Sequence, residues 1–416
     1  MKTKLFLTIF SFLIVQSTFS QETTANLSLG SGYANQVYYK LSTETTTSFD
    51  KNSWDVAFLR TSNFNHGVRV NDGIGIEIFE AANVASEWAN IDVYNQTSWS
   101  QLYNSDTERV DGAFMKGSAT YGWGEYNSSN HHIVGSIIFV LKYADDSYKK
   151  FICEDFYGGY TIKYASWDGT AWGEDKTAVI ANSSNQDNNY NYYSLQNDAE
   201  VVAEPAAIDW DFVFTKYDTD VSDGSGGTSK YNVTGVLSSD NITVATATGD
   251  DTASLSYSED INTIGYNWKS LNFETYTYDV DSDLKYYVKD ADDIIYKLYF
   301  SAFGGTSTGN VEFKFEDVTQ TLGLEEVGGH VTFGVYPNPV NSDKKINIIF
   351  DVNKVNQSNN NVEIYNLNGQ RVLKTKIINT QGFYNKEINL NSLESGVYML
   401  KFTSGNYQKM KKIVLR

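Results

Sequence analysis

The sequence predicts a mainly β protein: two tandem antiparallel β modules with a few short helices, followed by a small Ig-like β-sandwich. The first observation is composition. The 416 residues include 30 tyrosines, 31 glycines and only 3 prolines, and 15% are aromatic, which favours strands over helical bundles or disorder. The second is apolar–polar alternation between turn residues. The third is an internal repeat, which sets the number of modules.

The N-terminal residues have the organisation of a secretory signal peptide. Lys2 and Lys4 precede an apolar run, Leu5–Val15, and a stretch of small residues, Ser17–Ser20, follows it. The run is too short to cross a bilayer, and no later segment is apolar for long enough to be a membrane helix. We therefore expect a signal peptide at 1–20 and no transmembrane segment in the mature chain.

The repeat is clearest around two Trp-Asp motifs. S-W-D-V-A-F-L-R at Ser53–Arg60 returns as D-W-D-F-V-F-T-K at Asp209–Lys216. Upstream of each motif lies a tyrosine-rich segment, Q-V-Y-Y-K-L-S-T at Gln36–Thr43 and Y-N-Y-Y-S-L-Q-N at Tyr190–Asn197. Because order and spacing are kept, two modules of one fold are expected.

The same order continues downstream of the Trp-Asp motifs. Ile137–Ile152 and Asp283–Phe300 both turn at Ala-Asp-Asp, and a Gly-Gly pair follows each. These patterns predict a hairpin and then a last strand, at Thr161–Ala165 in the first copy and Val311–Phe315 in the second. The middle of the first copy, Val84–Ser105, has Trp and Leu spacings compatible with one or two short helices.

The C-terminal segment predicts a separate small domain. V-E-I-Y-N and Y-M-L-K-F alternate like strands with one face on a core, and Asn368-Gly369 suits a tight hairpin. The blocks V-Y-P-N-P at Val335–Pro339, V-E-I-Y-N-L-N-G-Q-R-V at Val362–Val372 and L-x-S-G-V-Y-M-L-K-F at Leu393–Phe402 closely resemble the type A C-terminal sorting domain of the type IX secretion system. This resemblance implies that the type IX machinery recognises residues 335–416.

The predicted division of the chain therefore has five parts. The expected location is outside the cell or on its outer surface, after removal of the signal peptide and of the C-terminal domain. The parts are a signal peptide at 1–20, modules at 22–175 and 176–320, a linker at 321–334 and a sorting domain at 335–416.

Charge and cysteine content limit the partners. The segment from Gly334 onward has 12 lysines and arginines and 5 acidic residues, a net charge of +7. Because the whole chain carries −19, the residues before Gly334 carry −26. An acidic body argues against nucleic acid as a partner. The single cysteine, Cys153, excludes an intramolecular disulfide, and its Phe-Ile-Cys setting favours a buried small apolar residue.

The landmarks of the repeat resemble the HmuY family of secreted haem-binding proteins. They are an aromatic strand, W-D-V-A-F, a basic stretch with Asn-Asp-Gly at residues 69–73, the pair Gly122-Trp123, and a strand–turn–strand of the form Y-x-x-K-x-x-D-x-x-Y-x-K. The resemblance implies tandem HmuY-like β modules with haem as the cofactor. It covers both modules and is better in the first.

Haem capture needs an aromatic cleft and axial donors, usually His or Met. The candidates in the first module are His66, Met115, His131 and His132. The second module contains neither His nor Met, and His330 lies in the predicted linker, so haem is expected in the first module only or on tyrosine. Successive strand residues face opposite ways, so His131 and His132 are not expected to share one iron.

No catalytic residues and no separate metal site are predicted, because zinc-protease, P-loop and Cys-x-x-Cys motifs are absent. The leading hypothesis is a non-enzymatic binding protein exported by the type IX system that binds haem through its first module. The alternative is a surface adhesin or structural protein whose modules bind glycan or protein and not haem. A hydrolase is ranked last.

Overall fold

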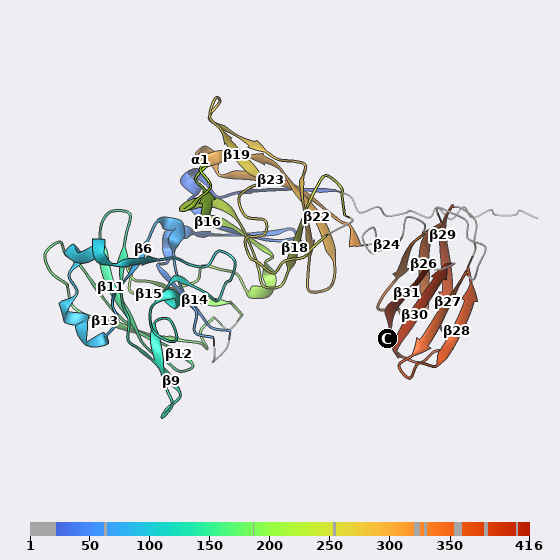
Figure 1. Ribbon diagram of the computed structural model, residues 1–416, viewed down its shortest axis with the longest axis horizontal. Helices are drawn as coiled ribbons and strands as arrows, with labels where there is room; N and C mark the ends of the chain where they lie inside the picture. Colours follow the sequence, from blue (N-terminus) through green and yellow to red (C-terminus); the bar gives the residue numbers. More distant parts are fainter. Residues whose placement is uncertain are drawn as a thin grey trace, which may run out of the picture.

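The computed structural model describes residues 22–61, 65–185, 187–252, 255–319, 325–327, 331–352, 360–377, 382–404 and 407–416 (Figure 1). The predicted signal peptide and His330 lie outside these residues. The described chain is mainly β, as predicted, with antiparallel sheets and short helices. Its strands form two packing units, which we call unit 1 and unit 2, and a C-terminal domain.

Unit 1 consists of two sheets. The larger has the order β13-β12-β11-β10-β6-β7, with the β8–β9 hairpin attached to β11, and the smaller has the order β15-β14-β4-β5. The strands are β4 (Val56–Leu59), β5 (Val68–Val70), β6 (Glu77–Ala82), β7 (Ser100–Leu102), β8 (Gly124–Asn127), β9 (His132–Gly135), β10 (Ile138–Lys142), β11 (Tyr148–Phe156), β12 (Gly159–Ser166), β13 (Lys176–Ala181), β14 (Tyr190–Ser194) and β15 (Ala199–Val201).

Short 3-10 helices complete unit 1. The region 84–105 forms two of them and one strand, in keeping with the sequence pattern. The helices are η2 (Lys51–Ser53), η3 (Asp72–Ile74), η4 (Ala85–Asn90), η5 (Val93–Ser98), η6 (Ala113–Lys116) and η7 (Ala207–Asp209), of which η2 and η7 lie where the chain passes between units.

Unit 2 repeats this plan with sheets of order β1-β23-β22-β21-β18 and β3-β2-β16-β17. A separate hairpin, β19–β20, projects from it. The elements are β1 (Thr23–Ser28), η1 (Ser31–Tyr33), β2 (Asn35–Lys40), β3 (Thr45–Asp50), β16 (Phe212–Ser222), β17 (Thr228–Ser238), β18 (Thr243–Thr248), β19 (Lys269–Asn272), β20 (Thr277–Val280), β21 (Leu284–Lys289), β22 (Ile295–Phe303), α1 (Gly305–Thr308) and β23 (Asn310–Asp317).

The two sequence repeats exchange their first three strands. The predicted modules, 22–175 and 176–320, are repeats in sequence, but the sheets do not divide the chain at those points. β1, β2 and β3 of the first repeat complete unit 2, and β13, β14 and β15 of the second repeat complete unit 1. The register is equivalent: Tyr39 lies opposite Phe212 in unit 2, and Tyr193 lies opposite Val56 in unit 1. Each unit therefore contains one Trp-Asp strand and the tyrosine-rich strand of the other repeat.

The buried Trp-Asp carboxylates fix this exchange. Asp55 Oδ2 accepts a hydrogen bond of 2.6 Å from the Leu195 backbone N–H, just after β14. Asp211 Oδ2 accepts one of 2.8 Å from the Leu41 backbone N–H, just after β2, and its Oδ1 pairs with Lys40 at 2.7 Å. Both carboxylates are buried, so they satisfy donors that burial would otherwise leave unpaired. Each Asp thus holds the turn that the other repeat contributes.

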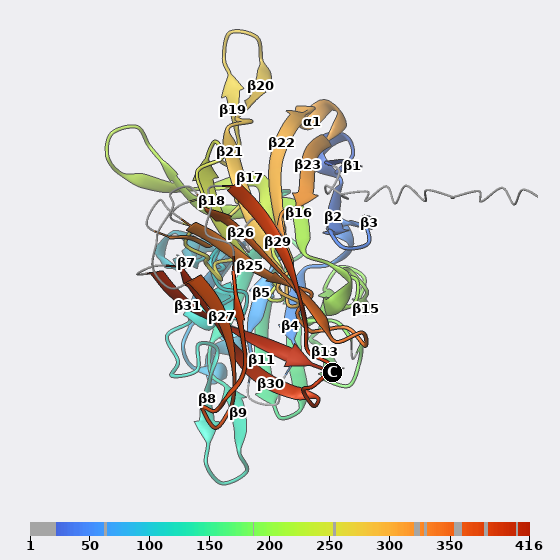
Figure 2. The same cartoon turned by 90° about the vertical axis from the view of Figure 1, so that its right-hand side faces the viewer.

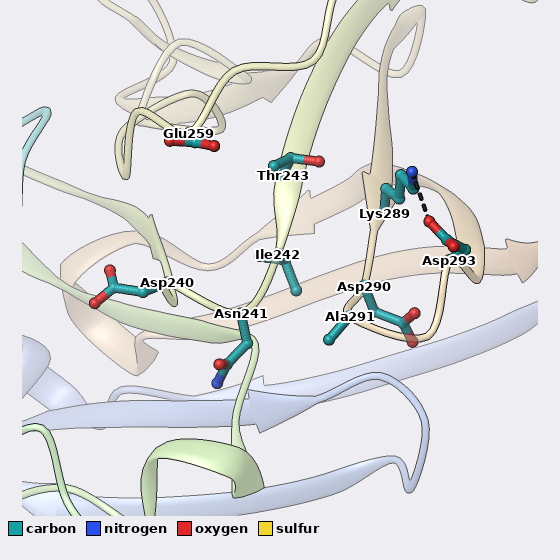
Figure 3. A pocket seen from close by; sticks show the side chains of 9 residues that line it. All are labelled: Asp240, Asn241, Ile242, Thr243, Glu259, Lys289, Asp290, Ala291 and Asp293. Atoms are coloured by element: carbon teal, nitrogen blue, oxygen red, sulfur yellow. Dashed lines mark ion pairs between the residues drawn. The ribbon is translucent and has the colours of Figure 1, made fainter.

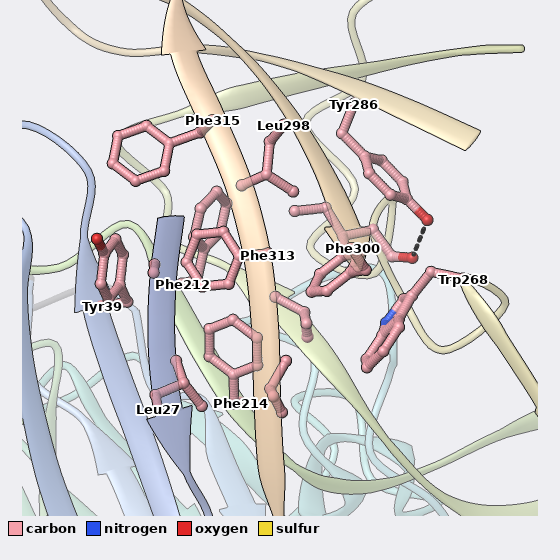
Figure 4. Packing of buried hydrophobic residues seen from close by; sticks show 14 of the residues in the cluster. Leu27, Tyr39, Phe212, Phe214, Trp268, Tyr286, Leu298, Phe300, Phe313 and Phe315 are labelled. Carbon is pink, nitrogen blue, oxygen red and sulfur yellow. Dashed lines mark hydrogen bonds between the residues drawn. The ribbon is translucent and has the colours of Figure 1, made fainter. Parts of the chain in front are cut away.

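The apolar cores confirm the exchange. In unit 2, Leu27 and Tyr39 pack among residues from 212–315, and Figure 4 shows both beside Phe313 and Phe214. In unit 1, the second-repeat residue Tyr193 packs with residues of the first repeat. A unit could not bury its core with one repeat alone in this arrangement.

The C-terminal domain is the predicted small β-sandwich. Its sheets have the orders β24-β25-β26-β29 and β28-β27-β30-β31, and Phe333 stacks on Phe402 across them with ring centroids 4.5 Å apart. The predicted linker, 321–334, is shorter than expected, because β24 and the start of β25 belong to this sandwich. Its strands are β24 (Glu325–Val327), β25 (Val331–Tyr336), β26 (Lys345–Val352), β27 (Asn360–Asn366), β28 (Arg371–Lys376), β29 (Gly382–Asn389), β30 (Gly396–Ser404) and β31 (Tyr407–Leu415).

The structure also bears on two further expectations, the burial of the single cysteine and the absence of a membrane helix. Cys153 is buried in the unit 1 core, and burial raises the pKa of its thiol. Among the described residues, no helix is long and apolar enough to cross a membrane.

Candidate functional site

A cavity of about 660 Å³ opens at one end of unit 1. Three elements supply its walls: the segment after β4, the β8–β9 hairpin, and the turn between β11 and β12. It is lined by His66, Tyr121, Tyr126, His131, Ile133, Phe156, Tyr157 and Gly158. We call it the His–Tyr pocket. Its aromatic walls with a few polar groups are typical of a small-molecule site.

The rings of this pocket form a connected row. The His66 centroid lies 5.6 Å from that of Tyr121, Tyr121 lies 6.1 Å from Tyr126, and Tyr126 lies 6.1 Å from His131. The Trp123 indole N–H donates to the His66 backbone oxygen at 3.2 Å and anchors one end of the row. The two imidazoles are therefore linked through two tyrosine rings.

The turn of the β8–β9 hairpin places His131. Its backbone has a φ of +65°, in the left-handed region that few residues other than Gly and Asn adopt, and its N–H donates to the Asn127 oxygen at 2.8 Å. In this conformation, its Nδ1 lies 2.6 Å from the Tyr126 hydroxyl oxygen. Positive φ also occurs at turn residues such as Asp146 and Asp293, so the conformation belongs to the hairpin turn, and the turn sets where the His131 ring lies.

His132 and Met115 are not among the residues that line the pocket. His132 Nδ1 lies 2.8 Å from an Asp155 carboxylate oxygen, and its ring stacks on Tyr157 with centroids 4.6 Å apart. His131 and His132 thus have different partners, as expected of neighbours at the start of a strand. Met115 belongs to η6 and packs against the unit 1 core. Of the four candidates, His66 and His131 come together.

The sequence analysis missed the tyrosines of this pocket. Tyr121, Tyr126 and Tyr157 are exposed, although large aromatic rings usually pack in a core. With 30 tyrosines in the chain, composition could not single them out. The available signal was Tyr126 five residues before His131 across Asn-rich turn residues, a spacing that places both at the base of one hairpin turn.

The corresponding end of unit 2 has different aromatic contacts. The strand pairings place Phe303, opposite Val311, at the position of Phe156, opposite Tyr160. The Phe303 centroid lies 4.8 Å from Tyr278, 5.4 Å from Trp268 and 6.0 Å from Tyr33. Phe303 and Phe156 are both buried, and Phe156 lines the His–Tyr pocket beside the exposed Tyr157. In unit 2, the hollow of about 570 Å³ beside Phe303 has no other aromatic residue among the described residues that line it.

Unit 2 has a different hollow, of about 460 Å³, lined largely by acidic and polar residues (Figure 3). Asp240, Glu259 and Asp290 line it, and Lys289 pairs with Asp293 at 2.7 Å. Within the described part of the chain, no group of three or more His, Cys, Asp or Glu side chains is arranged to hold a metal ion. An acidic, largely solvated surface is the simplest interpretation of this hollow.

The C-terminal domain matches a known family. Residues 334–416 match the model of the secretion system C-terminal sorting domain, which agrees with the resemblance seen in the sequence. The search of curated proteins and the search of solved structures gave no match. The sorting domain marks the protein as cargo of the type IX secretion machinery, destined for the cell surface or the exterior.

Proposed function

We propose that this exported chain is a non-enzymatic binding protein that takes up haem in the His–Tyr pocket of unit 1. The observation that carries the proposal is the meeting of His66 and His131 in one aromatic-lined cavity of about 660 Å³. Drug-sized and cofactor sites are of roughly 300–1,000 Å³, so the size suits a porphyrin that is partly held outside. The resemblance of the repeat to HmuY-like proteins supports the same ligand.

The residues present fit haem in one respect and differ in another. Exposed tyrosine rings offer flat apolar surface for a porphyrin face, and a planar ligand would cover rings that now contact water. The two imidazoles, however, are joined through Tyr121 and Tyr126, so they do not form a facing pair. The arrangement therefore favours one protein ligand to the iron from this pocket.

A haem titration of the full chain, followed by absorbance, tests the proposal. We expect saturable binding with a shifted Soret band, lost in a variant carrying both Tyr121→Ala and Tyr157→Ala. Single His66→Ala, Met115→Ala, His131→Ala and His132→Ala variants then separate pocket residues from the others. Met115→Ala and His132→Ala should bind like the unmodified chain. An unchanged spectrum on adding haem to the full chain would refute haem binding.

A second candidate function, adhesion, is favoured by the β19–β20 hairpin. Figure 2 shows this hairpin extending away from unit 2, and at its tip Phe273 is 78% and Tyr276 is 82% exposed. Exposed aromatic residues are common anchors in protein interfaces. If the protein is an adhesin, replacing both residues with Ser should abolish attachment of the purified chain to host glycans or matrix proteins. Haem binding would be unaffected by this change.

A further inference from the structure

We propose that the Tyr126 phenolic oxygen, rather than a histidine nitrogen, is the ligand that the pocket offers to the ferric iron of a porphyrin, and that His131 positions it. This inference rests on the proposed function and makes it specific. The sequence analysis gave this role to four other residues or to a tyrosine that it did not name, and the inference assigns it to Tyr126.

The geometry singles out Tyr126 among the rings of the pocket. Its side chain projects from β8 into the cavity, is 46% exposed, and has its hydroxyl oxygen 2.6 Å from His131 Nδ1. A distance of 2.6 Å is at the short end for a hydrogen bond between neutral partners, so the phenol and imidazole are well aligned.

The chemistry of coordination uses this pair. A neutral phenol is a poor ligand, whereas a phenolate is a hard anionic donor that suits ferric iron, and tyrosine serves as an axial haem ligand in proteins. Tyr126 would hold the iron through an oxygen lone pair, and the proton released from its O–H bond would be accepted by His131 Nδ1, 2.6 Å away. His131 would then stay hydrogen-bonded to the Tyr126 oxygen and hold it in place. No oxidant or reductant is needed.

The other candidates are engaged elsewhere. His66 lies at the inner end of the ring row, against Trp123 and Phe156, with centroids 5.9 Å and 6.1 Å away. His132 is held by Asp155 and stacks on Tyr157. Tyr126 lies farther along the row, between Tyr121 and His131, and is 46% exposed.

Comparing a porphyrin that contains iron with one that lacks it separates binding through the iron from binding through the porphyrin ring. The full chain and its variants are titrated with ferric haem and with metal-free protoporphyrin IX, following absorbance and the quenching of Trp fluorescence. Tyr126→Phe keeps the aromatic ring and removes the donor oxygen. It should bind metal-free protoporphyrin like the unmodified chain and lose about tenfold or more of its affinity for haem, together with the phenolate-to-iron charge-transfer band.

Two further variants test the pairing. Tyr231→Phe is the matched control, because it removes a hydroxyl from a 64% exposed tyrosine of β17, outside the pocket, and it should leave both titrations unchanged. His131→Gln removes the group that takes the proton, and it should weaken haem binding by about 10- to 100-fold while leaving metal-free porphyrin binding intact. Because these side chains are partly exposed, thermal unfolding of all three variants should match the unmodified chain.

The outcomes distinguish this inference from the proposed function. If the unmodified chain binds neither porphyrin, haem binding itself fails. If it binds haem, and Tyr126→Phe keeps the same affinity and absorption bands while His66→Ala loses them, the pocket is correct and the assignment of Tyr126 is overturned. Equal loss of haem and metal-free porphyrin in Tyr126→Phe would also overturn it, because the hydroxyl would then act on the ring and not on the iron.

Discussion

Units 1 and 2 share one strand order but differ in their aromatic residues at the same place. In unit 2, Phe303 is packed against Trp268 and Tyr278. In unit 1, Phe156 stands at the matching position and lines an aromatic cavity beside Tyr157, which is largely exposed. The same fold therefore packs its rings together at this end of unit 2 and leaves several of them exposed in unit 1. Exposed apolar surface of this kind usually marks a binding site.

The largest expected effect compares a packed ring of unit 2 with an exposed ring of unit 1. Phe303→Ala should lower the free energy of unfolding by about 3 kcal/mol or more, because it removes a packed ring and leaves a cavity. Tyr157→Ala should change it by less than about 1 kcal/mol, because the ring is mostly in water already. Urea unfolding followed by Trp fluorescence measures both. Equal effects would mean that the two rings are not in different environments.

The strand exchange predicts that replacing either buried Asp lowers the free energy of unfolding by a similar amount. Asp55→Ala and Asp211→Ala should each cost about 3 kcal/mol, because each leaves buried backbone N–H groups without an acceptor. Asp220→Asn, at an exposed ion pair with Lys230, is the control and should cost under about 0.5 kcal/mol. Chemical denaturation measures the series. A small effect at either buried Asp would contradict its role in holding the exchanged turn.

The buried Glu204 predicts that the stability of the protein depends on pH. Glu204 accepts hydrogen bonds from the Tyr190 backbone N–H and the Tyr192 hydroxyl, and burial raises its pKa from 4.5 to about 7. The folded state therefore binds more protons than the unfolded state between these values. Stability should fall as pH rises from about 4.5 to about 7, by about 3 kcal/mol for this group.

Glu204→Gln isolates that contribution. Asp72 is partly buried, and loss of hydration raises its pKa to about 6, so the unmodified chain should lose stability over an overlapping range. The Gln variant should show a shallower fall in melting temperature between about pH 5 and pH 7, whereas Glu200→Gln, on the exposed β15, should follow the unmodified chain. Parallel curves for the Glu204 variant and the unmodified chain would argue against a neutral Glu204 in the folded state.

The smallest expected effect concerns the β8–β9 hairpin, which supplies part of the pocket wall in unit 1. In β9, a Cβ on Gly135 would lie 1.8 Å from the Cys153 oxygen of β11, so Gly135→Ala must displace the β8–β9 hairpin. We expect a cost of about 2 kcal/mol together with loss of the His–Tyr pocket. Gly173→Ala, whose Cβ would meet only Ser166 at 3.4 Å, is the control. Calorimetry and haem titration measure both consequences; normal haem binding by Gly135→Ala would show that the hairpin does not build the site.

Much of the fold was present in local sequence patterns. The Ala-Asp-Asp hairpins, the last strands of each repeat and the short helices near 84–105 follow from alternation and turn chemistry, which act over a few residues. The sorting domain could also be predicted from the sequence, because its hairpin and strand motifs are each contained in a short stretch of residues. For the site, His66 and His131 were chosen by residue type alone. Tyr126 was not, because nothing local separates it from the other tyrosines.

The sequence by itself determined the strands, their order in each repeat and the sorting domain that directs export. Tertiary structure alone decided which repeat completes which sheet, since strand pairing joins residues more than a hundred positions apart, as Asp55 and Leu195 do. It also decided which aromatic rings are packed together and which line an open cavity. That outcome depends on contacts between side chains far apart in the chain, and no short stretch of sequence contains that information.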